Sequence, residues 1–361
     1  MANEPLFRKF EQDLSPRLPF PGHGAALLPD VTVESYNIEL RRQGKYVGDQ
    51  AAKRVFFDRL DNWRATLKGN AQDPFGDLPS EQLAKKTVDK VLRDGDPAAA
   101  GVIQSAIEDF AQSLFQVIRF FHDKSWRRVS HVVVGGGFRG SRVGELSIGR
   151  AQALLKADKL DVELMPIRHD PDEAGLIGAI YLMPRWIFAG FDAILAVDIG
   201  GTNVRCGIVR FESRRSGQPG VEKLLLWRHA DDDPSRDQML DETIGMLRTL
   251  VKLAQRRKIR LAPFIGVGCP SRVRLDGRIE QGDANLPGNW RARRFHLPTL
   301  LRDALPEIDG RRTIVTMHND AVVQGLSALP EMTQARQWAV VTIGTGLGNA
   351  QYANPPPAGK K

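Results

Sequence analysis

The sequence has few cysteines and no long uninterrupted apolar segment. Its only two cysteines, Cys206 and Cys269, form no Cys-x-x-Cys pair, which excludes a structural zinc site built on thiolates and a disulfide-rich scaffold. The most apolar region, residues 182–197, contains Arg185 and Asp192, so it does not fit a membrane span of about 20 apolar residues. The low cysteine content is typical of a reducing compartment, and we expect a cytoplasmic protein with no membrane partner.

The chain is basic overall but lacks a basic stripe. Lys and Arg total 51 and Asp and Glu total 43, which gives a net charge of +8. The basic residues occur as scattered pairs, such as Arg41-Arg42 and Arg256-Arg257, and alternate with acidic residues. A surface of this kind favours solubility and attracts small anions, and we therefore expect no nucleic-acid partner.

Length and patterning predict an α/β protein of two domains. The 361 residues are 42 % hydrophobic and 26 % charged, and a globular chain of this length usually forms more than one core. Strand-like apolar segments alternate with segments of helical spacing, which indicates helices layered around mixed or parallel sheets. Strands are expected near 131–134, 162–167, 194–199, 206–211, 222–228, 262–268, 313–318 and 338–343. Helices are expected near 49–67, 98–121, 143–155, 172–182, 236–254 and 320–328.

Three glycine-rich turns follow apolar strands. They lie in residues 196–203 (Ala-Val-Asp-Ile-Gly-Gly-Thr-Asn), 341–348 (Val-Thr-Ile-Gly-Thr-Gly-Leu-Gly) and 132–139 (Val-Val-Val-Gly-Gly-Gly-Phe-Arg). Glycine lets the main chain turn sharply and approach a ligand, and the N–H groups of such turns form an anion site. These turns predict phosphate binding, although none is followed by the Gly-Lys-Ser/Thr of a P-loop and the dinucleotide-binding Gly-x-Gly-x-x-Gly pattern is missing after Ile199.

Taken together, the motifs resemble the ROK group of sugar kinases and their glucokinase relatives, within the actin-like ATPase superfamily. Residues 198–205 and 344–348 resemble the two phosphate motifs of that family, and residues 135–137 resemble its adenosine motif. Residues 284–290 (Ala-Asn-Leu-Pro-Gly-Asn-Trp) resemble its sugar-binding segment. Residues 318–321 (His-Asn-Asp-Ala) resemble the segment that holds the sugar and its catalytic base.

The resemblance implies an ATP-dependent and Mg²⁺-dependent kinase that phosphorylates a hexose hydroxyl. It implies phosphate contacts at Gly200, Gly201, Thr202, Asn203, Gly344, Thr345 and Gly346, and adenosine contacts at Gly135, Gly136 and Gly137. Sugar contacts would come from Asn285, Asn319 and Asp320, with Asp320 as the general base. Asp198 precedes the first turn, where a carboxylate can hold a hydrated Mg²⁺ against phosphate oxygens.

The order of the motifs differs from that of the family. Members usually open with the first phosphate motif, whereas here it begins near residue 196 and the adenosine motif lies upstream of it. We therefore expect a circularly permuted form of the family fold, with two ribonuclease-H-like lobes around a cleft. The larger lobe would combine residues 1–183 and 318–361, and the smaller lobe would consist of residues 192–317. Residues 184–191 would connect the two lobes.

Permutation would bring the region that follows the second phosphate motif to the start of the chain. In the family this region holds a Gly-His, a zinc loop and a Leu-Glu. Residues 21–24 (Pro-Gly-His-Gly) and 33–36 (Val-Glu-Ser-Tyr) resemble its two ends, which makes His23 and Glu34 candidate sugar ligands. A loop histidine and a solvated acid are the alternatives. The cysteines of the zinc loop are absent, so we expect no zinc.

Three further interpretations stay open beside the kinase. One is a sugar-responsive regulator of the ROK type, and another is a catalytically silent sugar sensor. The third is another ATPase of the same superfamily, acetate-kinase-like or chaperone-like, over which the segments at Asn285 and Asn319-Asp320 favour a sugar. Residues 1–48 are too rich in proline for the helix-turn-helix domain of such regulators, and the retained Asp198 and Asp320 favour an enzyme. The sequence leaves open which sugar is bound and whether the protein is a monomer or a homo-oligomer.

Overall fold

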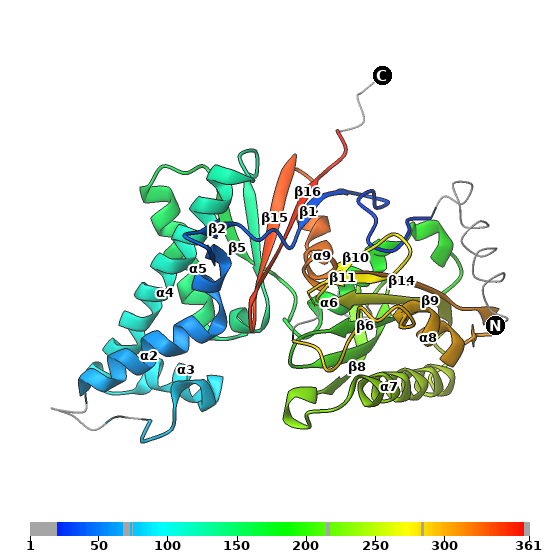
Figure 1. Cartoon of the computed structure of the whole chain (residues 1–361), viewed down its shortest axis with the longest axis horizontal. Helices are drawn as coiled ribbons and strands as arrows, with labels where there is room; N and C mark the ends of the chain where they lie inside the picture. The colour runs from blue at the N-terminus through cyan, green and yellow to red at the C-terminus, as the bar shows by residue number, and fades with distance from the viewer. Residues whose placement is uncertain (1–19, 68–72, 74, 214–216, 283–284, 357–361) are drawn as a thin grey trace. The chain divides into compact units, whose positions relative to one another are not determined.

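The computed structural model describes residues 20–67, 73, 75–213, 217–282 and 285–356. They divide into two compact units, each made from two separate segments of the chain. Unit 1 comprises Met1–Val31 and Ala179–Val323, and unit 2 comprises Thr32–Gly178 and Gln324–Lys361. Each unit contains one five-stranded sheet with helices packed on it (Figure 1). Within the described ranges, none of the helices combines the length and apolar character that a bilayer crossing requires.

Unit 1 is built on a sheet with the strand order β14-β9-β6-β7-β8. Its strands are β6 (Ala193–Ile199), β7 (Val204–Arg210), β8 (Gly220–Trp227), β9 (Leu261–Cys269) and β14 (Ile314–Asn319). Strands β14, β9 and β6 are parallel to one another. Strand β7 pairs antiparallel with β6, and β8 pairs antiparallel with β7. The central strand β6 is buried throughout, because its almost wholly apolar sequence can be covered on both faces.

Helices and short hairpins complete unit 1. The helices are α7 (Arg236–Arg256) and α8 (Leu297–Ala304), and the short strands are β10 (Arg272–Val273), β11 (Ile279–Gln281), β12 (Glu307–Ile308) and β13 (Arg311–Arg312). Helix α7 begins with a capping box at Ser235 and Gln238, and it packs against β7. Its buried residues Met239, Leu247 and Leu250 recur at helical spacing, as the sequence predicts.

Unit 2 has a sheet with the strand order β1-β16-β15-β4-β5. Its strands are β1 (Thr32–Tyr36), β4 (His131–Gly135), β5 (Glu163–Pro166), β15 (Gln337–Ile343) and β16 (Leu347–Ala353), with a short hairpin of β2 (Arg41–Arg42) and β3 (Lys45–Tyr46). Its helices are α2 (Lys53–Leu67), α3 (Lys85–Asp94), α4 (Pro97–Lys124), α5 (Arg142–Ala157) and the short α6 (Ala174–Gly178). Helix α4 begins at Pro97 with Asp96 as its N-cap, which gives the helix a sharp start.

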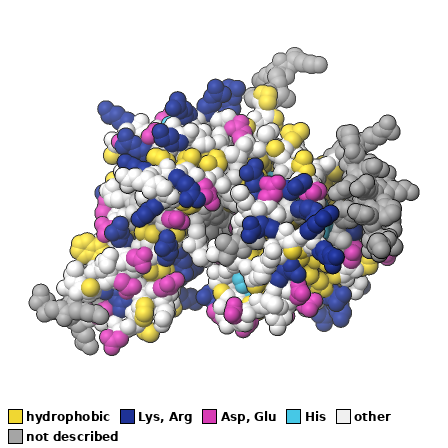
Figure 2. Space-filling view, in the orientation of Figure 1, with side chains coloured by type: hydrophobic (Ala, Val, Ile, Leu, Met, Phe, Trp, Pro, Cys, Tyr) yellow, Lys and Arg dark blue, Asp and Glu magenta, His cyan; other side chains and the backbone are white. Residues whose placement is uncertain are grey.

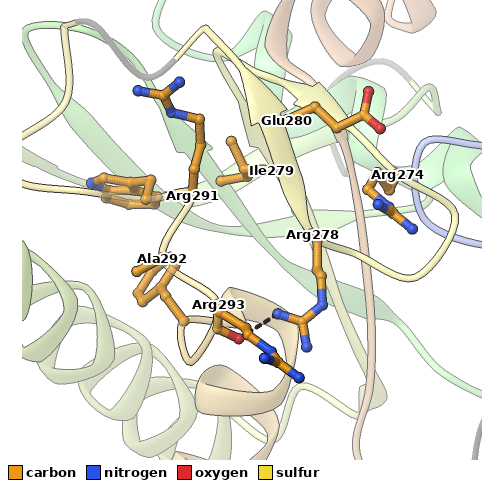
Figure 3. Close-up of a pocket in the computed structure, with 9 residues that line it drawn as sticks. Arg274, Arg278, Ile279, Glu280, Arg291, Ala292 and Arg293 are labelled. Atoms are coloured by element: carbon orange, nitrogen blue, oxygen red, sulfur yellow. Dashed lines mark hydrogen bonds between the residues drawn. The ribbon is translucent and has the colours of Figure 1, made fainter.

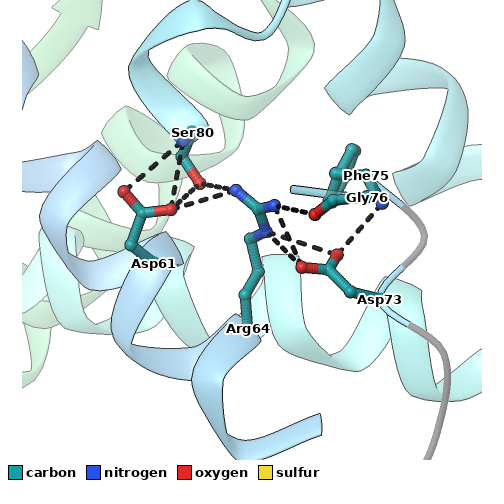
Figure 4. Close-up of polar contacts among 6 residues, drawn as sticks. All are labelled: Asp61, Arg64, Asp73, Phe75, Gly76 and Ser80. Carbon is teal, nitrogen blue, oxygen red and sulfur yellow. Dashed lines mark hydrogen bonds and ion pairs between the residues drawn. The ribbon is translucent and has the colours of Figure 1, made fainter. Parts of the chain in front are cut away.

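A buried ion-pair network fixes the loop that follows α2 in unit 2. Arg64 is 5 % exposed and uses all five of its N–H groups in the network (Figure 4). The guanidinium pairs with Asp61 at 3.0 Å and with Asp73 at 2.9 Å, and it donates hydrogen bonds to Ser80 and to the carbonyl oxygen of Gly76. One side chain therefore ties helix α2 to three points of the following segment.

The two sheets share one strand order when the strands of unit 2 are counted from β15. In unit 1 the first to fifth strands along the chain lie in the spatial order 5-4-1-2-3. Counting β15, β16, β1, β4 and β5 gives unit 2 the same spatial order and the same parallel and antiparallel pairings. Along the chain, however, β15 and β16 come last. The strand sequence of unit 2 is therefore a cyclic shift of that of unit 1.

The predicted α/β class is confirmed, but the predicted division of the chain shifts at three places. Residues 184–191, expected to connect the two lobes, belong to unit 1. So do residues 20–31, 179–183 and 318–323, which were expected in the lobe that combines 1–183 with 318–361. Residues 20–31 run beside β14, where the N–H of Gly24 donates to the carbonyl oxygen of Met317 at 2.9 Å. The last includes the end of β14 itself, so its hydrogen bonds to β9 hold it in unit 1.

Candidate functional site

Two aspartates lie together at the carboxyl ends of the parallel strands of unit 1. Asp198 is next to the last residue of β6 and pairs in register with Gly268 of β9, while Asp320 directly follows β14. A Cβ placed on Gly268 would lie 3.4 Å from Oδ1 of Asp198 and 3.5 Å from Cα of Asp320. A side chain at position 268 would thus contact both aspartates, so Gly268 lies between them. Such an edge is a common ligand-binding position in α/β proteins.

The surroundings of Asp320 favour a proton on its carboxyl group. Burial raises the pKa of Asp320 to about 7, and the negative charge of Asp198 adds to this effect. Backbone N–H groups and the Asn319 amide, which stabilise the ionised form, lower the pKa of Asp320 without cancelling the rise. A carboxylate whose pKa lies near neutrality is suited to accepting a proton from a substrate.

Asn319 holds Asp320 and caps a helix. Its side chain is fully buried, and its two N–H groups donate to the carbonyl oxygen of Ser271 at 3.2 Å and to Oδ1 of Asp320 at 3.0 Å. Its Oδ1 accepts from the N–H of Val322 at 3.2 Å, near the start of α9 (Asp320–Leu326). Both N–H groups of Asn319 are thus used within the protein. Sequence alone did not identify Ser271.

Asp198 is paired with a cation on the neighbouring strand. Arg205 of β7 stands opposite Asp198 in the register, and its Nη1 lies 3.3 Å from Oδ2 of Asp198, with both side chains largely buried. The other oxygen, Oδ1, faces Gly268, where a Cβ would lie 3.4 Å from it. Among the described residues, no group of three or more His, Cys, Asp or Glu could hold a metal ion. A single carboxylate fits an Mg²⁺ that keeps most of its ligands as water and phosphate oxygens.

The first glycine turn is fastened from a neighbouring segment of unit 1. The N–H of Gly200 donates to the carbonyl oxygen of Asn203 at 2.8 Å, which closes the turn. Its carbonyl oxygen lies 3.0 Å from Nε2 of His229, a buried histidine, and the carbonyl oxygen of Thr202 accepts from the N–H of Ala230 at 3.2 Å. His229 is a positioning residue that the sequence analysis missed, because a lone histidine after a strand carries no distinguishing pattern.

The predicted sugar segment lies against this turn. A Cβ on Gly201 would lie 2.9 Å from the Cβ of Asn285, which is closer than real Cβ contacts come. Only glycine at position 201 therefore permits this approach of the exposed Asn285. The structure thus brings together a predicted phosphate contact and a predicted sugar contact that are far apart in sequence. Ala284 of the same segment lies outside the described residues.

Unit 2 places its two glycine turns at one edge of its sheet. β4 and β15 are parallel neighbours with Gly135 opposite Thr342, so residues 135–137 and 344–346 both follow the carboxyl ends of adjacent strands. Gly136 has φ +85°, and a Cβ there would lie 2.4 Å from the carbonyl oxygen of Ile343. Gly344 differs, because the nearest atom to a Cβ there would be the carbonyl oxygen of Gly346, at 3.9 Å. The exposed Thr345 lies between these glycines.

His23 and Glu34 lie in different units and have structural contacts. In unit 1, Nδ1 of His23 accepts from the N–H of Met317 at 3.1 Å, and burial lowers the pKa of His23 to about 4. In unit 2, the exposed Glu34 accepts from the side-chain amides of Gln337 and Gln351 at 3.0 and 2.9 Å. Gln337 begins β15, so Glu34 lies roughly 20 Å along the strand from the turn at its other end, at about 3.3 Å per residue. Among the described contacts, none joins either residue to Asn285 or Asp320.

Comparison with known proteins finds similarity only at the level of solved structures. No family model and no curated protein matches the chain. A proposed sugar kinase from Cytophaga hutchinsonii is 21 % identical, with 45 % of this chain and 48 % of that chain covered and a TM-score of 0.34. A proposed N-acetylmannosamine kinase from Listeria monocytogenes is 24 % identical, with 45 % and 47 % covered and a TM-score of 0.32. A ROK hexokinase from Thermus thermophilus is 19 % identical, with 44 % and 45 % covered and a TM-score of 0.31. The matched part thus spans about half the length of these structures.

Proposed function

We propose that this protein is an ATP-dependent sugar kinase, which transfers the γ-phosphoryl group of Mg-ATP to a hydroxyl group of a hexose. The observation that carries the proposal is the pair of aspartates at the strand ends of unit 1, beside the glycine turn that contacts Asn285. One aspartate has a raised pKa and the other is paired with Arg205. Two carboxylates in different environments can take the two roles that phosphoryl transfer requires.

In this mechanism Asp320 is the general base. Its carboxylate accepts the proton of the sugar hydroxyl while the hydroxyl oxygen attacks the γ-phosphorus and the bond to the bridging oxygen of ADP breaks. Asn319 positions the carboxylate through its 3.0 Å hydrogen bond, and Ser271 and Val322 hold the amide in place. The exposed Asn285 is the proposed direct contact to the sugar.

Asp198 is the residue proposed to hold Mg²⁺ through water. The ion, when bound, neutralises charge on the transferred phosphoryl group. Arg205 keeps Oδ2 of Asp198 in place, and Oδ1 lies 3.4 Å from the position that a Cβ on Gly268 would occupy. The N–H groups of residues 200–203 and 344–346 are the proposed phosphate contacts, and residues 135–137 the proposed adenosine contact.

The cyclic relation between the two sheets supports the proposed circular permutation. A chain that began at β15 and ended after β5 would list the strands of unit 2 in the order that unit 1 shows. Residues 32–178 and 324–361 would then form one proposed nucleotide-binding unit.

A coupled ADP-release assay over a panel of hexoses and amino sugars, with Mg²⁺ and ATP, tests the function. ADP release that depends on one sugar supports the kinase. A protein that binds a sugar in calorimetry without releasing ADP is a silent sensor, and sugar-dependent DNA binding would identify a regulator.

The rate should depend on pH with a midpoint near neutrality. Because the base must be ionised and burial raises the pKa of Asp320 to about 7, we expect kcat/KM to fall as the pH decreases through about 7. The pH profile of kcat/KM for the best sugar measures this. Asp198→Asn removes the second cause of the raised pKa, so the midpoint of its residual activity should move to lower pH. A profile that stays flat from pH 5 to 8 contradicts the assignment of Asp320.

Two glycine substitutions in unit 2 should separate nucleotide binding from folding. Gly344→Val adds a side chain next to open space, so the fold should keep its stability while ATP affinity decreases at least about tenfold through lost charge-assisted hydrogen bonds. Gly136→Val, the comparison variant, should unfold at lower temperature because of its positive φ and the close approach to Ile343. Calorimetric ATP titration and thermal unfolding of both variants check this. Unchanged ATP affinity in folded Gly344→Val would place the nucleotide elsewhere.

A further inference from the structure

A buried histidine precedes the proposed catalytic base by two residues. His318 lies in β14 and is 1 % exposed, and Asp320 directly follows that strand. Histidine contributes little to the face of the molecule shown in Figure 2. A buried imidazole ring needs hydrogen-bond partners for its nitrogen atoms, and the mechanism proposed above gives this ring no role. The contacts of the ring therefore need an explanation of their own.

The ring nitrogens of His318 contact two main-chain groups. Nδ1 accepts from the N–H of Asn319 at 2.8 Å, and Nε2 lies 3.2 Å from the carbonyl oxygen of Ala25. A main-chain N–H only donates and a carbonyl oxygen only accepts, so the neutral ring with its proton on Nε2 is the form that satisfies both contacts. Burial also lowers the pKa of His318 to about 4, which keeps the ring neutral at physiological pH.

The segment that contains Ala25 is itself fixed to the outermost strand of the unit 1 sheet. Nδ1 of His23 accepts from the N–H of Met317 at 3.1 Å, and the N–H of Gly24 donates to the carbonyl oxygen of Met317 at 2.9 Å. These two hydrogen bonds satisfy main-chain groups of β14, which is an edge strand. The segment therefore follows the strand as far as the ring of His318.

The β10–β11 hairpin packs against the same segment. Gly24 has φ +55°, and a Cβ there would lie 2.2 Å from the carbonyl oxygen of Val273 in β10, so only glycine permits this approach. The hairpin is tied in turn to the segment that follows it by the 2.6 Å hydrogen bond from Nη1 of Arg278 to the carbonyl oxygen of Arg293 (Figure 3). Residues 23–25 are therefore held by both β14 and the hairpin.

The ring of His318 completes the hydrogen bonds of Asn319. The side-chain amide of Asn319 contacts Ser271, Val322 and Asp320, and its main-chain N–H donates to His318. Asn319 is fully buried, so without this acceptor the N–H would lose its partner away from water, which is unfavourable. A rotation of the chain that restored a partner would also displace the carboxylate of the next residue.

We propose that His318 is a positioning residue for Asp320, because its neutral ring joins the segment at Ala25 to the N–H of Asn319 and so fixes the carboxylate that takes the sugar proton. This role rests on the proposed kinase function. Loss of the bond to Asn319 should lower kcat, whereas loss of the bond to Ala25 should chiefly lower the stability of the fold.

Two substitutions separate the two bonds of the ring. His318→Asn places an acceptor oxygen where Nδ1 lies, whereas His318→Gln extends an amide N–H towards Ala25 and has no acceptor in the place of Nδ1. In His318→Gln, kcat should fall at least about tenfold while the sugar KM changes less than about twofold, because a displaced base affects proton transfer more than sugar binding. His318→Asn should keep kcat within about threefold of the unsubstituted protein, because the orientation of the base is retained. Steady-state ADP release with the best sugar measures both constants.

His296→Gln is the matched control. In this ring, which also belongs to unit 1, Nδ1 accepts from the N–H of Thr299 at 3.2 Å and Nε2 lies 2.7 Å from the carbonyl oxygen of Asp276. The substitution should lower Tm and leave kcat unchanged, because these bonds hold the start of α8 and not Asn319. Equal losses of kcat in His318→Gln and His318→Asn, a loss of the same size in His296→Gln, or an unchanged kcat in folded His318→Gln would overturn the proposal.

A spectroscopic measurement on the unsubstituted protein tests the ring contacts without activity. Histidine ¹⁵N chemical shifts distinguish the two neutral tautomers from the charged ring, and we expect His318 to carry its proton on Nε2 at pH 7. A proton on Nδ1, or a charged ring, would contradict the contact with Asn319 even if neither variant folded. If no sugar supports ADP release, the proposed kinase function fails and the role of His318 fails with it. Normal ADP release that is insensitive to His318→Gln refutes the role of His318 alone.

Discussion

Asp320→Asn should reduce kcat for sugar phosphorylation at least about 10²-fold, the lower end of the contribution that a general base makes. The substitution keeps the size of the side chain and the Oδ1 atom that accepts from Asn319, but it removes the group that takes the proton. The sugar Kd should change far less than kcat, because Asn285 is retained. Steady-state ADP release and calorimetric sugar titration measure the two quantities.

The same substitution should make the fold more stable at alkaline pH. The raised pKa of Asp320 means that the folded state binds this proton more tightly than the unfolded state, whose aspartate has a pKa near 3.8. The stabilising contribution of the proton is therefore complete below about pH 4 and is lost as the pH rises to about 7. We expect Asp320→Asn to raise Tm at pH 8 and to change it little at pH 4. Near-normal kcat in this variant, with the Tm gain present, would remove Asp320 as the base.

Arg64→Ala is expected to reduce the free energy of unfolding by about 3–5 kcal/mol, the usual result of removing one partner from a buried ion pair. Asp73, with a side chain only 9 % exposed, would lose its partner, and Asp61 would lose a 3.0 Å contact (Figure 4). Ser80 and the carbonyl oxygen of Gly76 would also lose a donor. Urea unfolding followed by circular dichroism measures the change.

Arg93→Ala is the matched control for this experiment. Arg93 pairs with Asp94 at 2.8 Å, but both side chains are exposed, so the free energy of unfolding should change far less than in Arg64→Ala. Equal losses in the two variants would show that the Arg64 network contributes no more than a surface pair. The triple variant Asp61→Asn/Arg64→Met/Asp73→Asn should recover part of the loss, because it leaves no unpaired charge.

The sheets and their turns were predictable because the sequence patterns that indicate them, apolar runs followed by glycines, are local. A run such as Ala193–Ile199 is apolar enough to indicate a buried strand, and the glycines that follow it indicate a sharp turn. The juxtaposition of Gly201 and Asn285 was anticipated only through the family resemblance, because no local pattern relates residues so distant in sequence.

The contacts that hold the site were not predictable. Asn319 is suited by its chemistry both to bind a sugar and to cap α9, and its contacts with Ser271 and Val322 depend on how distant segments pack. His23 and Glu34 were selected as the two ends of one motif, yet the chain enters the other unit between them, at residues 31 and 32. The position of such a boundary depends on the sheet with which each segment pairs. That pairing is a property of the whole fold and not of the local sequence.

The strand order of unit 2 also sets the sequence of events during translation. β1 and β4 leave the ribosome before the second segment of unit 1, but their partners β16 and β15 are made after it. Roughly 200 residues separate β4 from β15, an interval of roughly 10–40 s at about 5–20 residues per second. Unit 1 can therefore complete its sheet first, while the nascent chain carries two unpaired strand edges that chaperones must shield until residues 337–353 emerge.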